Sequence, residues 1–385
     1  MAERVLLHIG APKAGTTFLQ TILWKNRESL GAQGLLVPGK RRFDFNLAAR
    51  SVTTKIPDTG SGKRRPPAIA AWEAIVDETL QWPGDVVISN EWFAPASRRQ
   101  AERAIRHWGL DQVHIVFTAR AFVYQVPAAW QEKLKLGEGQ SLADFTAGLD
   151  SGDQRWSWRT LDPADVLSRW GRMLPAEHVH VVTVPPRGSE RELLWKRFAH
   201  LLGIDAGSCD ISAAHANESM SAESARLLQL VGPLLREAID ADNAYWKEKY
   251  RWIRQYVAHE LLVPRGGSRI GLPAPTVAAL RERSVRCVDI LTRAGYDIVG
   301  DLSELLIDDP GPGSRNPEDV PDSELLGLAV PVLADLVRRV REEAARAELA
   351  STKPPPADGP TEGRFDADVF NPSELDPYDS LPAQG

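Results

Sequence analysis

The sequence predicts a three-layer α/β fold with a mostly parallel central sheet. The main signal is a set of short, continuous apolar runs, each followed by a loop and a segment with helical periodicity. A strand without polar alternation is buried on both faces, and in a parallel sheet helices cover both faces. The four predicted strands are Val5–Ile9, Asp85–Ser89, Val113–Thr118 and Val179–Val184.

Composition narrows the class of protein. The 385 residues are 43% hydrophobic and 25% charged, which is typical of a globular protein. A net charge of −6 gives no general reason to expect nucleic acid or an anionic membrane as partner. No apolar run approaches the ~20 residues of a membrane span, and a core strand begins at Val5, which leaves no room for a signal peptide. Cys209 and Cys287 are too few for a disulfide framework or a cysteine zinc site. We therefore expect a cytoplasmic protein.

One domain is expected to span residues 1–306, with a helical part over 221–306. Ser221 to Ser224 can start a helix, and a second helix is predicted from Pro275 to Ala294.

The remaining sequence divides into three pieces. Residues 307–323 are rich in Pro, Gly and Asp and are predicted to be a linker. Residues 324–350 have a helical pattern, which Pro331 is expected to kink or restart. Residues 351–385 contain seven prolines, seven acidic residues and two basic residues, so we expect a disordered, acidic, Pro-rich tail.

The turn after the first strand has the composition of a phosphate site. It runs from Gly10 to Gly15 and leads into a predicted helix whose first turn carries Thr16 and Thr17. N–H groups at a helix start, the helix dipole and one lysine together attract a phosphate group. The spacing of the two glycines is that of a P-loop, but Thr16 stands where the lysine is expected and Lys13 lies three residues earlier. This displacement argues against an ordinary ATPase or GTPase, although a P-loop-like fold is expected.

Charged residues also follow the next two strands. Glu91 comes after the second strand and Arg120 after the third. Ligands of parallel α/β folds bind at the carboxyl ends of the strands, so we expect both residues to lie near Lys13.

The run Pro12-Lys13-Ala14-Gly15-Thr16-Thr17 resembles the 5′-phosphosulfate-binding loop of sulfotransferases, enzymes that use 3′-phosphoadenosine 5′-phosphosulfate (PAPS) as sulfuryl donor. The resemblance implies that this loop holds the 5′-phosphate of the donor. It further implies that Lys13 contacts the oxygen that bridges phosphate and sulfate. The alternative is that a strand–turn–helix unit carries these residues by chance.

In the same family an arginine at the end of the third strand and a serine eight residues later bind the 3′-phosphate. Arg120 matches the arginine, but Ala128 occupies the serine position and has no hydroxyl. The loss of one hydrogen bond to a charged group costs roughly 1.5–3 kcal/mol, so donor binding is expected to be weakened rather than abolished. A structural salt bridge is the alternative role for Arg120.

Family members use histidine or glutamate to take the proton of the acceptor, and Glu91 has a suitable place for that role. The alternative is a surface glutamate that caps the next helix. His8 lies inside the first strand and is expected to be a hydrogen-bonded core residue.

Weaker similarities to a bacterial branch of the family extend the resemblance to residues 1–306. Thr183-Val184-Pro185-Pro186 and Leu193-Leu194-Trp195 match that branch. A basic, glycine-rich loop of the family that reaches the 3′-phosphate is matched only by Arg265 and Gly266, for which an ordinary turn is the alternative. Residues 40–65 hold eight basic and two acidic residues and form either a basic lid or a solvated loop.

The sequence thus favours a PAPS-dependent sulfotransferase that acts without a metal on a hydroxyl or amine of a small-molecule or carbohydrate acceptor. Two other hypotheses stay open. One is a non-catalytic nucleotide-binding relative, which Ala128 favours. The other is a P-loop kinase, which would need ATP and Mg²⁺. Neither the acceptor nor the oligomeric state follows from the sequence.

Overall fold

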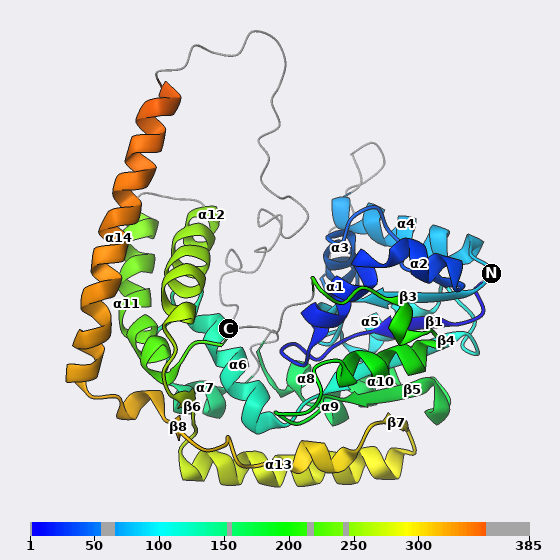
Figure 1. Cartoon of the computed structure of the whole chain (residues 1–385). Helices are drawn as coiled ribbons and strands as arrows, with labels where there is room; N and C mark the ends of the chain where they lie inside the picture. Colours follow the sequence, from blue (N-terminus) through cyan, green and yellow to red (C-terminus); the bar gives the residue numbers. More distant parts are fainter. Residues whose placement is uncertain (1, 55–65, 152–155, 214–218, 242–245, 352–385) are drawn as a thin grey trace. The chain divides into compact units, whose positions relative to one another are not determined.

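The computed structural model describes residues 2–54, 66–151, 156–213, 219–241 and 246–351 (Figure 1). The chain divides into two compact units. Unit 1 comprises residues 1–129, 143–217 and 273–309, and unit 2 comprises residues 130–142, 218–272 and 310–385. Residues 55–65 of the basic segment and nearly all of the predicted disordered tail lie outside the described residues.

Unit 1 is built on a sheet of six strands in the order β2-β3-β1-β4-β5-β7. Every neighbouring pair in this sheet is parallel, which confirms the predicted fold class. The strands are β1 Val5–His8, β2 Leu35–Leu36, β3 Asp85–Ser89, β4 Val113–Ala119, β5 Val179–Thr183 and β7 Asp297–Val299.

The core of unit 1 lies on both faces of this sheet. All residues of β1, β4 and β5 are buried, so helices must cover both faces, and Figure 1 shows the strands flanked by helices. These helices are α1 Thr16–Lys25, α2 Arg27–Ala32, α3 Asp44–Thr53, α4 Pro67–Gln81, α5 Arg98–Ile105, α8 Trp158–Leu161, α9 Pro163–Trp170, α10 Leu193–Leu202 and α13 Ala274–Ala294. Short 3₁₀ turns are η1 Glu91–Phe93, η2 Ala176–His178, η3 Ala206–Ser208 and η6 Leu302–Leu306. Helices α6 Phe122–Leu134 and α7 Leu142–Gly148 contribute residues to both units.

Unit 2 is mainly helical. Helix α14 packs along α11 and the π-helix η4, and all three run side by side in Figure 1. Glu132 forms a buried ion-pair cluster in this unit, with Lys135 at 3.1 Å and Arg254 at 2.5 Å. The elements of unit 2 are α11 Ala222–Ala241, α12 Trp246–Lys249, η4 Tyr250–Leu262, η5 Val263–Arg265, β6 Arg269–Ile270, β8 Ser314–Arg315, η7 Pro317–Asp319 and α14 Asp322–Ser351.

Two prolines do not break their helices. Pro127 lies inside α6, which continues past it to Leu134. Pro331 lies inside the 30 residues of α14, so the last helix does not restart there. A proline in a helix removes one backbone hydrogen bond and costs about 3 kcal/mol.

Three histidines form a cluster where β4 and β5 begin. Nδ1 of His114 lies 2.8 Å from Nε2 of His180, and the rings of His114 and His178 stack with centroids 4.2 Å apart. Nδ1 of His180 lies 2.7 Å from Oδ2 of Asp297. Burial, with the neighbouring histidines, lowers the pKa of His114 to about 4. Burial also lowers the pKa of His180, and the contact with Asp297 opposes this shift.

The cluster predicts a loss of stability in mild acid. The pKa of His114 falls from 6.5 in the unfolded chain to about 4 in the folded protein, so the unfolded chain binds the proton more tightly. The stabilisation is fully present above pH 6.5 and is lost as the pH falls toward 4. Between pH 7 and pH 5 we expect His114 to account for a fall of about 2 kcal/mol in the free energy of unfolding. Urea unfolding at both pH values should show that His114→Gln reduces the fall by this amount, and an equal fall in both proteins would contradict the assignment.

Candidate functional site

The loop between β1 and α1 is held through its carbonyl groups. Three side chains from β4 and the segment that follows it donate hydrogen bonds to carbonyl oxygens of this loop. They are Oγ1 of Thr118 to Gly10 at 2.9 Å, Nε2 of Gln125 to Pro12 at 2.9 Å and a terminal nitrogen of Arg120 to Lys13 at 2.9 Å. With these carbonyls bound, the loop has a fixed path into α1.

Two residues of the loop, Lys13 and Gly15, have a left-handed backbone conformation. Gly15 precedes α1 with φ 83°, a left-handed conformation that strains residues with a side chain, and a Cβ there would lie 2.4 Å from Cδ2 of Leu194 on α10, which would have to move. Lys13 has φ 63°, a left-handed conformation that is uncommon outside glycine and often found at functional sites.

The start of α1 suits an anion. The helix begins at Thr16 without a side-chain cap, and its first turn has no acidic residue. The first N–H groups of a helix have no partners within the helix, and together with the helix dipole they attract negative charge. Thr16 is buried and Thr17 is exposed. The predicted helix start with both threonines is therefore confirmed.

Arg120 is the second cationic centre of the site. It follows β4, the strand next to β1, and its hydrogen bond to Lys13 joins it to the loop. Burial, and then the charge of Arg187, lowers the pKa of Arg120 to about 10, and Tyr124 partly opposes the shift. Among the described residues no carboxylate forms an ion pair with Arg120, so the salt bridge considered from the sequence is absent there. A desolvated cation without a counter-charge favours an anionic ligand.

Arg187 and Tyr124 extend this cationic centre. The Arg187 guanidinium lies 4.5 Å from the centre of the Tyr124 ring, and that of Arg120 lies 5.8 Å from it. Arg187 follows the carboxyl end of β5. A charged residue of the candidate site therefore follows each of the four adjacent strands β3, β1, β4 and β5. The sequence did not single out Arg187, because no motif in the residues after β5 indicates a role for it.

Ala128 on α6 is half-buried and presents a methyl group where the family resemblance implies a hydroxyl.

Glu91 lies in a polar network beside α1. Gln20 donates a hydrogen bond from Nε2 to Oε2 of Glu91 at 3.0 Å, and Arg42 donates to Oε1 of Gln20 at 3.3 Å. Burial lowers the pKa of Arg42, and the charge of Glu91 opposes this shift. The carboxylate of Glu91 is thus half-buried and oriented by a side chain of α1. The part of the basic segment that the structure describes places Arg42 against α1 rather than in a solvated loop.

His8 supports the loop from within the sheet. It is fully buried, with Nδ1 2.7 Å from Oγ of Ser89 and Nε2 3.3 Å from Oγ1 of Thr118. Burial lowers the pKa of His8 to about 3, so the ring is neutral. The prediction of a hydrogen-bonded core histidine is confirmed. Because Thr118 in turn binds the Gly10 carbonyl, His8 helps to fix the loop.

Arg265 and Gly266 belong to unit 2. Arg265 ends η5 and pairs with Asp335 of α14 at 2.5 Å, and Gly266 follows it with φ 60°. Their assignment to donor binding stays a prediction.

In the described ranges, no group of three or more His, Cys, Asp or Glu side chains is placed to hold a metal ion. Among those residues, no helix is long and apolar enough to cross a membrane.

The chain is similar to a sulfotransferase from Alicyclobacillus acidocaldarius whose crystal structure is known. The two share 14% identity and superpose with a TM-score of 0.36 over 64% of this chain and 100% of that one. No protein-family model matches the sequence, and no curated protein matches it. A similarity with this TM-score does not support an assignment of function. The assignment therefore depends on the geometry of the site.

Proposed function

We propose that this protein is a sulfotransferase that moves a sulfuryl group from PAPS to a hydroxyl or amine of a small-molecule or carbohydrate acceptor. The observation that carries the proposal is the hydrogen bond of 2.9 Å from Arg120 to the Lys13 carbonyl. It joins two cationic centres, the start of α1 with Lys13 and the desolvated Arg120, at the ends of adjacent strands. PAPS carries a phosphate at each of two ribose positions and so offers one anion to each centre.

The residues divide into donor-binding and reacting groups. The loop 12–17, with the N–H groups of Thr16 and Thr17, would hold the 5′-phosphate. Arg120 would bind the 3′-phosphate, and Arg187 beside it would supply a contact in place of the hydroxyl that Ala128 lacks.

In the reaction the acceptor oxygen or nitrogen forms a bond to sulfur while the bond from sulfur to the phosphate oxygen breaks. Lys13 would stabilise the charge that develops on that leaving oxygen. Glu91, held by Gln20, would take the proton of the acceptor. The leaving group's charge is met by lysine and backbone N–H groups, so the proposal requires no metal.

Ala128 favours a second candidate, a nucleotide-binding relative without catalytic activity. The two candidates share donor binding and differ in sulfuryl transfer. Glu91→Gln should slow transfer without weakening donor binding if Glu91 takes the acceptor's proton.

Donor binding is tested by thermal unfolding with the product 3′-phosphoadenosine 5′-phosphate and, separately, with ATP and Mg²⁺. A ligand at 100 times its Kd stabilises the folded protein by about 2.7 kcal/mol, which is a few degrees in Tm. We expect this shift with the bisphosphate. Ala128→Ser should tighten its binding at least about tenfold by adding one hydrogen bond to a charged group. Ala334→Ser, at an exposed alanine of α14, should not change binding. A shift with Mg-ATP alone would favour the kinase, and no shift with either ligand would contradict the proposal.

A further inference from the structure

Helix α14 has two apolar faces, of which only one is covered in the described structure. The inner face packs within unit 2 against α11 and η4, with Leu325 buried and Val332 and Leu336 half-buried. The other face carries five large apolar side chains that are each between 51% and 64% exposed. We call these residues the outer stripe: Leu326, Val330, Leu333, Val337 and Val340.

The outer stripe has the spacing of a coiled-coil seam. Successive members are separated by four, three, four and three residues, and the exposed Ala344 continues the series. This is the heptad repeat in which the two apolar positions, a and d, face a partner helix. Val330 and Val337 occupy the a positions, and Leu326 and Leu333 occupy d positions. β-branched residues at a with leucine at d favour two-stranded pairing. From 326 to 344 the seam is about 27 Å long.

The charges of α14 favour a protein partner over a lipid surface. The helix carries four arginines and six acidic residues, a balance of −2. Helices that lie on membranes are rich in Lys and Arg on their polar face, which does not fit this balance.

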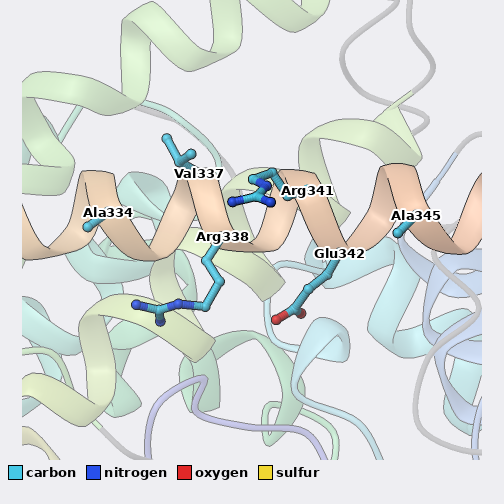
Figure 2. A pocket seen from close by; sticks show the side chains of 6 residues that line it. All are labelled: Ala334, Val337, Arg338, Arg341, Glu342 and Ala345. Atoms are coloured by element: carbon cyan, nitrogen blue, oxygen red, sulfur yellow. The ribbon is translucent and has the colours of Figure 1, made fainter.

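Charged side chains lie beside the outer stripe. Val337 shares one side of α14 with Ala334, Arg338, Arg341, Glu342 and Ala345 (Figure 2). Arg338, Arg341 and Glu342 therefore place charges of both signs next to the apolar seam. Mixed charge beside an apolar seam is typical of paired helices.

We propose that a second copy of this chain covers the outer stripe, with the two α14 helices paired as a two-stranded coiled coil. In such a seam the partner helix must carry apolar residues at the same heptad positions. A second copy of the outer stripe carries Val and Leu at these positions. A symmetric dimer uses the same patch on both subunits, so one stripe per chain is sufficient. Helix α11, which packs against α14, also exposes Leu230 and Leu234, which add apolar surface to unit 2.

The test is the mass of the full chain in solution. Sedimentation velocity of the wild-type protein from 1 to 100 µM should give a species of twice 42.4 kDa. Val337→Glu places a charge in the seam of each subunit and should raise the dimer Kd at least about tenfold. Val285→Glu on α13 is the matched control, because Val285 and Val337 are each 53% exposed, and it should leave the dimer intact. Far-UV circular dichroism should be unchanged in both variants.

Two results would overturn the proposal. The first is a wild-type monomer throughout the concentration range. If removal of residues 352–385 then allowed dimerisation, the chain's own C-terminal segment would be the occupant of the stripe. The second is a dimer that Val337→Glu leaves as stable as Val285→Glu does.

Discussion

Replacing Lys13 by methionine is expected to lower the rate of sulfuryl transfer by about 10²–10³-fold, the usual effect of removing one group that stabilises a developing negative charge. Methionine keeps the length of the side chain and its apolar stem but has no positive charge. Because the unidentified acceptor is not needed for transfer to water, the measurement is release of sulfate from PAPS with the enzyme in excess. Binding of 3′-phosphoadenosine 5′-phosphate should weaken much less than the rate falls, since the first-turn N–H groups of α1 and Arg120 remain.

Lys25→Met is the matched control for this prediction. Lys25 lies in the last turn of the same helix and pairs with Asp210 at 2.5 Å, away from the loop. Its replacement should leave sulfate release unchanged. Equal rates for Lys13→Met and the wild-type protein would remove Lys13 from the reaction. A Lys13→Met protein that loses bisphosphate binding in proportion to its rate would make Lys13 a binding residue instead.

The central strands could be predicted because burial on both faces leaves continuous apolar runs. The prediction for Asp85–Ser89 agrees with β3 at both ends, and Val5–Ile9 differs from β1 by one residue. Strands at the two edges of the sheet leave no such signal. Leu35–Leu36 has only two residues, and Asp297–Val299 is partly exposed and begins with a charge. Both strands exist because neighbouring backbone groups pair with them, which no local pattern records.

The candidate site could be predicted as far as it depends on chain order. Lys13, Glu91 and Arg120 each follow a strong strand, so a parallel sheet brings them to one edge. Arg187 and Arg42 could not be assigned in this way. Arg187 reaches Tyr124 because β5 lies beside β4, and Arg42 reaches Gln20 through packing against α1. Their roles depend on distances between segments that are far apart in the sequence.

Arg120→Met is expected to change stability and binding in opposite directions. The variant removes a desolvated charge that has no carboxylate partner among the described residues, at the loss of one hydrogen bond to Lys13. Replacing a buried ion pair by well-packed apolar side chains is neutral or stabilises a protein by roughly 1–4 kcal/mol, and a charge without a carboxylate partner is compensated less than a paired one. We expect a gain near the lower end of this range in the ligand-free protein. We also expect the affinity for 3′-phosphoadenosine 5′-phosphate to fall by about 100-fold or more, because the 3′-phosphate loses its main cation.

A rise in stability together with a fall in affinity for the bisphosphate would distinguish a binding role for Arg120 from a structural role. If Arg120 mainly held the loop, its loss would lower the urea midpoint and weaken the bisphosphate and adenosine 5′-phosphate alike. If it binds the 3′-phosphate, the midpoint should rise and only the ligand with a 3′-phosphate should lose affinity. Arg169→Met is a suitable comparison, because burial lowers the pKa of Arg169 to about 10 as well, but its guanidinium donates to the carbonyls of Ala94 and Arg159. That variant should be destabilised, since it leaves buried carbonyl groups without a partner.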